Sequence, residues 1–282
     1  MKLVLFDIDG TLLNTGTFGV KSLERAVKNL TGKMPKYDVK ELIGVSDKKN
    51  FIYMYTCAAG KAPTAKQLES VKKEYLKLLP EELAGLKKTK KYKAASGVEK
   101  FLKELQKYKD VKLALATGNV EEAAKIKLAP AGLDKYFVTG GFGWDGVKRP
   151  ELLKAAVKRA SKVFKYAFTP DDVYVIGDTH LDIMAAKANG YHSAVIKEAG
   201  LADKERLLRA AAEVEAESFK DSELLLIWLD LKQDPKGVEK GSYIMPATAI
   251  EHVFFSRTGI DEQRLKMFRI KKYEDLESGK IW

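Results

Sequence analysis

Residues 3–6 form an unbroken apolar run, Leu-Val-Leu-Phe, which stops at the acidic segment Asp7-Ile8-Asp9-Gly10-Thr11. A continuous run of this kind is typical of a strand covered on both faces, as in a parallel sheet. Ligands of parallel sheets bind beyond the carboxyl ends of the strands. Two carboxylates flanking one apolar residue can hold a divalent cation there and leave an oxygen free for nucleophilic attack. The alternative is an Asx-type turn that closes the strand.

Short apolar runs alternate with helical patterns further along the chain. The apolar runs span residues 111–116, 136–139, 173–176 and 193–196, and the helical patterns span residues 97–107, 120–131 and 151–162. Such alternation predicts a parallel sheet with helices on both faces. We therefore expect an α/β fold with a doubly wound, Rossmann-like parallel-sheet core.

The segment after the first strand differs from the rest in charge and in pattern. Residues 14–96 contain 18 Lys and Arg against 8 Asp and Glu, while the whole chain carries a net charge of +11. Helical patterns cover residues 19–30, 48–59 and 64–79, and Thr64 is suited to cap the last of them. We expect residues 14–93 to form an inserted helical domain and residues 1–13 and 94–232 to form the core.

Residues 233–282 form a C-terminal extension that begins near a break at Pro235-Lys236-Gly237. The extension is too rich in aromatic residues for a disordered tail. We expect it to pack on its own core, with a homodimer contact and then a partner surface as alternatives. The chain is accordingly expected to be a monomer or a homodimer.

Composition excludes several classes of protein. A content of 45% apolar residues supports a buried core, and no apolar stretch approaches the roughly 18 residues that span a bilayer. The first apolar run is also too short for a signal peptide, so we expect a cytoplasmic protein without a membrane partner. Cys57 is the only cysteine, which excludes intrachain disulfides. Few Gln, Asn and Cys residues beside 32% charged residues resemble a thermophile composition.

Polar groups follow three of the expected strands. The run at 113–116 ends in Thr117-Gly118-Asn119, which offers a hydroxyl and backbone N–H groups at a helix N-terminus, where an anion is stabilised. The run at 173–176 ends in a segment with carboxylates at Asp178 and Asp182, which suit a cation that prefers oxygen ligands. A basic side chain from Lys148-Arg149-Pro150 could neutralise both a phosphate and an aspartate.

In this order the motifs resemble those of the haloacid dehalogenase superfamily, and the resemblance covers residues 1 to 232. It is carried by Asp-x-Asp-Gly-Thr at 7–11, by Thr-Gly-Asn at 117–119 and by Gly-Asp-Thr-x-x-Asp at 177–182. The resemblance, of the phosphoglycolate phosphatase-like type, implies that Asp7 is a nucleophile that becomes an aspartyl-phosphate. It implies that Asp9 protonates the leaving group and then activates water.

The same resemblance implies how phosphate and metal would be bound. Thr117, with Gly118 and Asn119, would bind the transferring phosphoryl group. Asp178 would complete a Mg²⁺ site with Asp7 and the carbonyl of Asp9, and Asp182 would support that site from behind. The inserted helical segment resembles the cap of the superfamily, and Ser46, Lys48 and Lys49 resemble its substrate-contacting loop.

The basic position departs from the pattern of the superfamily, which usually has lysine before a proline. Here Arg149 precedes Pro150 and Lys148 comes one residue earlier. We favour Arg149, keep Lys148 as the alternative, and note Lys127 on the helix after Asn119 as a third candidate. Gly140-Gly141-Phe142-Gly143 lacks the context of a dinucleotide fingerprint and is interpreted as a turn.

We thus expect a Mg²⁺-dependent phosphatase that acts on a small phosphorylated metabolite. A sugar-phosphate mutase uses the same aspartate pair and stays open as an alternative. A dehalogenase is disfavoured because Asp9 supplies acid–base chemistry that carbon–halogen displacement does not need. A non-enzymatic module that binds nucleic acid or another polyanion is disfavoured because the basic residues of 14–96 have few aromatic stacking partners.

Overall fold

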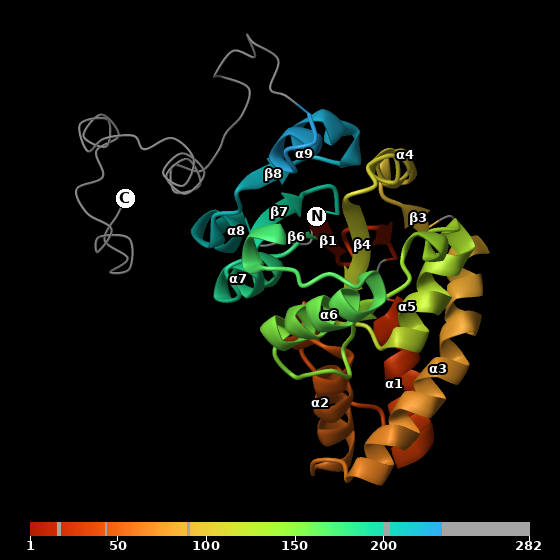
Figure 1. Ribbon diagram of the computed structural model, residues 1–282. Helices are drawn as coiled ribbons and strands as arrows, with labels where there is room; N and C mark the ends of the chain where they lie inside the picture. The colour runs from red at the N-terminus through yellow and green to blue at the C-terminus, as the bar shows by residue number, and fades with distance from the viewer. Residues whose placement is uncertain (16–17, 43, 89–90, 200–203, 233–282) are drawn as a thin grey trace.

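The computed structural model describes residues 1–15, 18–42, 44–88, 91–199 and 204–232 (Figure 1). Its strands are β1 (Lys2–Phe6), β2 (Leu13–Asn14), β3 (Lys93–Ala94), β4 (Val111–Ala116), β5 (Gly140–Gly141), β6 (Val173–Gly177), β7 (His192–Ile196) and β8 (Val214–Ala216). Its α-helices are α1 (Phe18–Thr31), α2 (Asp47–Ala59), α3 (Ala65–Lys88), α4 (Val98–Leu105), α5 (Glu121–Leu128), α6 (Arg149–Phe164), α7 (His180–Ala188), α8 (Lys204–Ala210) and α9 (Ser222–Trp228). The C-terminal extension, residues 233–282, lies outside the described residues, and its expected packing on the core stays a prediction.

Six strands form one parallel sheet in the order β5-β4-β1-β6-β7-β8. The chain builds the sheet outward from β1 through β4 to β5, and then returns to the other side of β1 for β6, β7 and β8. The direction of winding therefore changes between β1 and β6, which is the point where doubly wound sheets bind their ligands. The predicted doubly wound α/β class is confirmed. The sequence pattern does not predict β8, whose three residues are too few to show a period.

Alternate residues of the strands pack against helices on opposite faces of the sheet. Val4 and Phe6 of β1 pack in one cluster with residues of α4, α5 and α9. Leu3 and Leu5 pack in another cluster with residues of α6 and α7. All four side chains are fully buried, and burial of a side chain of this size contributes about 1.5–3 kcal/mol. This two-sided burial explains why the first strand is apolar throughout.

Helices α1, α2 and α3 lie together below the sheet (Figure 1). In the sequence they come between the short strands β2 and β3, which pair antiparallel with each other. Their own cluster contains Phe51, Met54 and Tyr75, so the helices share a core of their own. Thr64 accepts a hydrogen bond from the backbone N–H of Gln67, as its predicted capping role requires. The three predicted helices are present in this segment, and the domain limits at 14 and 93 stay a prediction.

The expected end of α3 at residue 79 is wrong, because the helix continues to Lys88 through Pro80. Proline inside a helix removes a backbone hydrogen bond and normally ends or kinks the helix. Here Leu79 and Leu83, one helical turn apart on either side of the proline, are both buried in the helical core. Burial of this continuous apolar face offsets the cost of the proline.

The expected strand at 136–139 and the expected turn at 140–143 are also wrong. Asp134–Tyr136 forms a 3-10 turn, and the edge strand β5 is Gly140–Gly141. Gly141 is needed because α6 crosses this strand closely: a Cβ on Gly141 would lie 1.9 Å from the carbonyl oxygen of Leu152. A Cβ on Gly140 would instead lie 2.9 Å from the carbonyl oxygen of Leu115 on β4. A glycine pair can thus mark a strand that another backbone approaches, in addition to marking a turn.

Substitution of Gly141 by alanine is expected to destabilise the protein by at least about 2 kcal/mol, because the added methyl group would collide with the backbone of α6. A matched control is Gly85→Ala on the exposed face of α3, where a Cβ has no atom within 4 Å. That change should stabilise the protein by about 0.5–1 kcal/mol through helix propensity. Urea unfolding of both variants tests the pair, and equal midpoints would contradict the close approach.

No helix in the part of the chain that the structure describes is long and apolar enough to cross a bilayer.

Candidate active site

The ends of β1, β4 and β6 bring distant parts of the sequence to one edge of the sheet. Phe6 is paired with Leu115 of β4 on one side and with Ile176 of β6 on the other. The backbone N–H of Asp7 continues the ladder by donating to the carbonyl oxygen of Ile176 at 3.0 Å. The segments that begin at Asp7, Thr117 and Asp178 therefore leave the sheet side by side.

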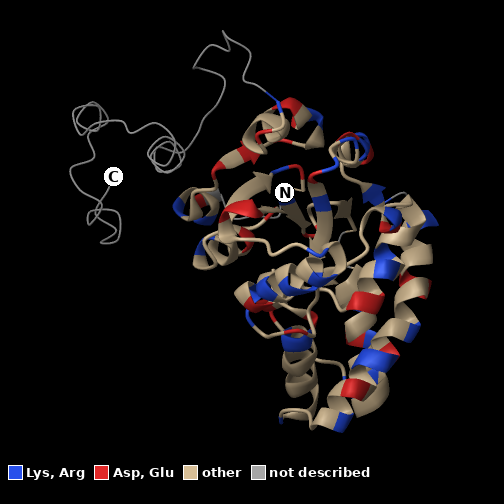
Figure 2. Ribbon diagram, in the orientation of Figure 1, with Lys and Arg blue, Asp and Glu red and all other residues tan. Residues whose placement is uncertain are grey.

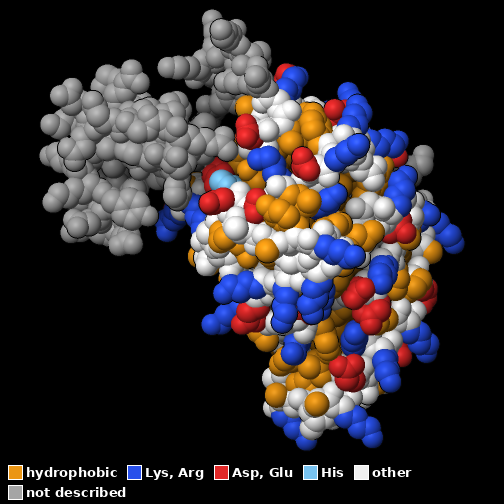
Figure 3. All heavy atoms as spheres, viewed as in Figure 1, with side chains coloured by type: hydrophobic (Ala, Val, Ile, Leu, Met, Phe, Trp, Pro, Cys, Tyr) orange, Lys and Arg blue, Asp and Glu red, His pale blue; other side chains and the backbone are white. Residues whose placement is uncertain are grey.

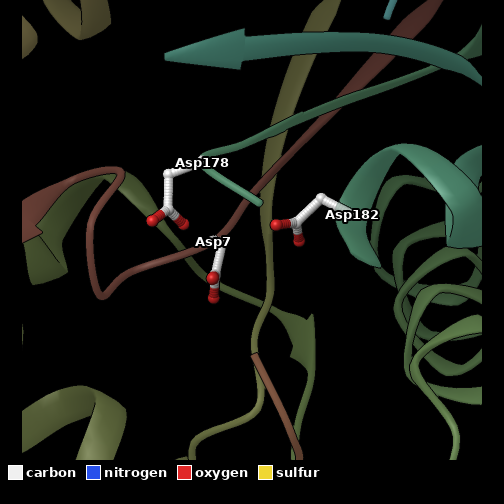
Figure 4. Close-up of side chains that lie close together, drawn as sticks. All are labelled: Asp7, Asp178 and Asp182. Atoms are coloured by element: carbon white, nitrogen blue, oxygen red, sulfur yellow. The ribbon is translucent and has the colours of Figure 1, made fainter. Parts of the chain in front are cut away.

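Asp7, Asp178 and Asp182 form a buried acidic cluster at the winding reversal between β1 and β6 (Figure 4). One carboxylate oxygen from each lies within 4.8 Å of the others, and the three side chains lie close together in Figure 4. Gly10 makes room for this arrangement. A Cβ there would lie 2.0 Å from Oδ2 of Asp178, and the φ of 84° also favours glycine.

Arg149, the first residue of α6, reaches into the acidic cluster. Its Nη2 lies 2.7 Å from Oδ2 of Asp7 and 2.5 Å from Oδ1 of Asp182, and its side chain is only 8% exposed. Lys148 occupies the N-cap position of α6, where its residue is exposed to solvent. Of the two candidates, the structure thus brings Arg149, and not Lys148, to the carboxylates.

The cluster retains excess negative charge, because three carboxylates face one guanidinium. Burial and the neighbouring carboxylates raise the pKa of Asp178 well above its usual range. Burial also raises the pKa of Asp7, an effect that Arg149 only partly opposes. Three buried carboxylates with about two uncompensated charges are suited to a nearby divalent cation, which prefers oxygen ligands. Among the residues that the structure describes, the carboxylate of Asp9 does not belong to this cluster.

Asp9 lies on the other side of the turn, in a separate network of donors. Its Oδ2 accepts hydrogen bonds from Nζ of Lys127 at 2.6 Å and from the Asn119 amide at 2.8 Å, and its Oδ1 accepts from the Thr15 hydroxyl at 2.7 Å. Although burial acts in the opposite direction, Lys127 and these hydrogen bonds hold the pKa of Asp9 below its usual range. Two carboxylates two residues apart thus have opposite pKa shifts.

The Thr117–Asn119 segment is held by both the core and the helical segment. Thr117 and Asn119 are buried, and the Asn119 amide also donates to the Thr117 hydroxyl at 2.8 Å. Gly118 lets the loop before α2 approach, since a Cβ on it would lie 2.6 Å from the carbonyl oxygen of Val45. Of the three predicted residues, Asn119 therefore contacts Asp9, Thr117 forms a hydrogen bond with Asp7, and Gly118 contacts the loop before α2.

Asp47 is a site residue that sequence reasoning missed. Its backbone N–H donates to the Gly118 carbonyl at 2.7 Å, and its Oδ2 accepts from the Val120 N–H at 2.8 Å. One N–H that was expected to be open to an anion at the start of α5 is therefore already bonded. The signal in the sequence was present, because Asp47 lies between Ser46 and Lys48.

The three predicted substrate-contacting residues, Ser46, Lys48 and Lys49, differ in their burial and contacts. Ser46 is buried and caps α2, since its hydroxyl accepts from the Lys49 N–H at 3.5 Å. Lys48 lies 6.0 Å from the centre of the Trp144 ring, while Lys49 is exposed. Trp144 itself packs against Phe51 of the helical core, with ring centroids 5.9 Å apart. The indole therefore contributes to the contact between the helical segment and the core.

Asp47 predicts a pH dependence of stability. Burial raises its pKa from 3.8 to about 6, so the folded state binds more protons than the unfolded state between pH 4 and 6. Stability must therefore fall as pH rises through this window. Asp47→Asn keeps an oxygen for Val120 but removes the charge. The stability gain of the variant over wild type should be about 2 kcal/mol larger at pH 7.5 than at pH 4.5. Urea unfolding across this range tests it, and parallel curves would contradict the buried charge.

The fold and the site define a class of α/β enzymes that bind anionic substrates at the carboxyl edge of a parallel sheet. Carboxylates and cations are gathered there beside an inserted helical segment. The chain belongs to the haloacid dehalogenase-like hydrolase family, whose sequence model matches residues 4–196. Together with the relatives below, this membership indicates a phosphatase enzyme.

Known relatives agree with this membership. A phosphorylated carbohydrates phosphatase from Thermotoga maritima is 28% identical over 217 residues, which cover 75% of this chain and 92% of that protein. The structure of a hydrolase from Pseudomonas syringae has the same fold, with a TM-score of 0.59 at 24% identity over 82% of this chain and 98% of that one. A candidate β-phosphoglucomutase from Thermotoga maritima has a TM-score of 0.53 at 25% identity, with 82% and 100% covered.

Proposed function

We propose that this protein is a Mg²⁺-dependent phosphomonoester hydrolase that acts on a small phosphorylated metabolite through an aspartyl-phosphate on Asp7. One observation carries the proposal: Asp7 and Asp9 leave the same strand, yet Asp7 faces Arg149 and the acidic cluster while Asp9 faces Lys127 and Asn119. A nucleophile and a proton carrier with different surroundings are what two-step phosphoryl transfer requires.

The proposed first step is attack of an Asp7 carboxylate oxygen on phosphorus. The bond between phosphorus and the leaving-group oxygen breaks. Asp9 is ionised before substrate binds, takes up a proton from solvent as the phosphate enters, and gives this proton to the leaving oxygen. In the second step Asp9 takes a proton from water, the resulting hydroxide attacks phosphorus, and the bond to Asp7 breaks. The products are the alcohol and inorganic phosphate, and Asp7 and Asp9 return to their starting forms once Asp9 releases its proton to solvent.

Negative charge must be neutralised for a phosphate dianion to approach these aspartates. Arg149 is assigned this role because its guanidinium contacts Asp7 directly, with Lys148 as the alternative. Thr117, Gly118 and Asn119 would bind the transferring phosphoryl group.

Asp7, Asp178 and the carbonyl of Asp9 would hold Mg²⁺, with Asp182 supporting the site through Arg149 and Thr179. When bound, Mg²⁺ would neutralise the excess carboxylate charge, keep Asp7 ionised and withdraw charge from the phosphate. The requirement for a divalent cation follows from the acidic cluster, in which one arginine compensates three carboxylates.

Residues 14–93 are proposed to act as a cap that covers the site and excludes water during transfer. Several hydrogen bonds join this segment to the core around the site. They include those of Asp47 with Gly118 and with Val120, of Gly44 with Arg149, and of Ser46 with Val147. A cap this close leaves room for a small leaving group. Ser46, Lys48 and Lys49 are the proposed substrate contacts of the cap.

A sugar-phosphate mutase is the second candidate, favoured by the likeness to the candidate β-phosphoglucomutase. It would use the same aspartate pair and return the phosphoryl group to the sugar. Binding of a polyanion finds less support. Basic and acidic residues are mixed along α3 in Figure 2, and basic side chains lie among acidic and apolar ones on the face shown in Figure 3.

The test is phosphate release from a panel of alkyl, sugar and aryl phosphates, each with Mg²⁺ and with a chelator. Release that requires Mg²⁺ is expected, and release that persists in the chelator would contradict the metal requirement. Isomerisation of a sugar 1-phosphate to a 6-phosphate, without release of phosphate, would instead establish the mutase.

A further inference from the structure

Lys127 is a buried cation of the core that the proposed roles above do not use. It lies in the last turn of α5 and is only 5% exposed. The hydroxyl of Tyr92 donates a 2.7 Å hydrogen bond to the Lys127 carbonyl oxygen and so fixes this turn. The Lys127 ammonium lies 5.3 Å from the centre of the Phe18 ring, at the start of α1. Two residues of the 14–93 segment, one near each of its ends, therefore hold the position of Lys127.

The position of Lys127 relative to the two aspartates separates its role from that of Arg149. Nζ of Lys127 lies 2.6 Å from Oδ2 of Asp9, whereas Arg149 contacts Asp7 and Asp182. One cation thus faces the nucleophile and the other faces the residue that handles the proton of the leaving group. A cation beside Asp9 is placed where charge appears when the leaving oxygen departs.

The surroundings of Lys127 leave space on the side of the helical segment. A Cβ on Gly19 of α1 would lie 3.6 Å from Nζ of Lys127 and 3.5 Å from the hydroxyl of Tyr75 on α3. Both polar atoms therefore border the volume that the glycine leaves free. This methyl-sized volume lies at the boundary between the helical segment and the core and borders the ammonium that pairs with Asp9. A cap would enclose the leaving group on this side.

We propose that the Lys127 ammonium contacts the leaving-group oxygen and stabilises the negative charge that develops on it as the bond to phosphorus breaks. The electron pair of that bond goes to the leaving oxygen, which also receives the proton from Asp9. A fixed cation at a developing oxyanion matters most for basic leaving groups. The inference rests on the proposed function and deepens it: the physiological substrates are esters of aliphatic alcohols, whose oxygens are poor leaving groups.

The experiment measures kcat/KM for a series of aryl phosphates of decreasing leaving-group acidity and for one alkyl phosphate. The enzymes are wild type, Lys127→Met and Lys127→Arg, all with Mg²⁺. The ratio kcat/KM reports on the steps up to and including cleavage of the bond to the leaving group. Lys127→Met should lose at least about 100-fold with the alkyl phosphate, by analogy with removal of one oxyanion donor, and far less with a dinitrophenyl ester. A plot of log kcat/KM against leaving-group pKa should have a steeper slope for Lys127→Met than for wild type. Lys127→Arg should recover part of the lost kcat/KM.

Lys125→Met is the matched control, because Lys125 is exposed on the same helix and pairs with Glu121. It should behave as wild type with every ester. An equal loss for all leaving groups in Lys127→Met would overturn the proposal and leave a structural ion pair. If the methionine variant does not fold, Lys127→Arg is the test. A lower kcat/KM for all esters, with a slope against leaving-group pKa identical to that of wild type, would also overturn the proposal. Absence of phosphate release by wild type would overturn the proposed function itself.

Discussion

Asp7→Asn is expected to lower phosphate release by at least about 10³-fold, because the amide oxygen is a far weaker nucleophile than a carboxylate. The fold should not suffer. Burial and the carboxylates of Asp182 and Asp9 raise the pKa of Asp7, so a neutral isostere relieves repulsion in the cluster. We therefore expect a melting temperature equal to or above that of wild type. Loss of activity with retained stability distinguishes a nucleophile from a structural residue.

Two measurements make this test specific to Asp7. The first is acid-quenched labelling with ³²P-phosphorylated substrate, in which wild type should retain label on Asp7 and the variant should retain none. The second is the control variant Asp110→Asn, which alters an exposed aspartate at the start of β4, at the opposite edge of the same sheet. Its activity should be unchanged. Full activity in Asp7→Asn would contradict the aspartyl-phosphate mechanism.

Arg149→Met is expected to have the largest combined effect on stability and activity. Removal of the guanidinium leaves Asp7 and Asp182 buried without their cation, which typically costs about 3–5 kcal/mol. We expect kcat/KM to fall by about 10²–10³-fold, since charge on the transferring phosphoryl group is no longer neutralised. Urea unfolding in a chelator and phosphate release with Mg²⁺ measure the two effects.

The pH dependence of this destabilisation has a defined sign. Arg149 lowers the pKa of Asp7, so its removal raises that pKa further. A group with a raised pKa in the folded state destabilises the fold at high pH, and the deficit of the variant should shrink as pH falls and Asp7 becomes protonated. A deficit that is constant from pH 5 to pH 8 would contradict a charge effect.

Lys148→Met is the matched control for Arg149→Met, and it also tests the alternative basic residue. Lys148 is exposed at the N-cap of α6, so its removal should change stability by less than about 0.5 kcal/mol and leave kcat/KM unchanged. A large loss in Lys148→Met with little change in Arg149→Met would transfer the catalytic role to Lys148.

The fold class was predictable because both faces of the sheet are covered. Full burial forces β1 and the runs at 111–116 and 173–176 to be apolar throughout, and this pattern is visible in one dimension. The limits of β5 were not predictable. Gly140 and Gly141 carry no periodic signal. Gly140 is needed because of Leu115 on the neighbouring strand, and Gly141 because of a helix that begins eight residues later.

The sequence by itself determined which segments meet at the site. Parallel strands place their carboxyl ends at one edge, so Asp7, Thr117 and Asp178 had to approach one another once the strands were recognised. Only the tertiary structure decided which side chains pair there. Adjacent residues at a helix start point in different directions, which brings Arg149 to Asp7 and leaves Lys148 in solvent. The pairs of Lys127 with Asp9 and of Asp47 with Val120 join residues far apart in the chain, and such contacts depend on helix packing that no local pattern encodes.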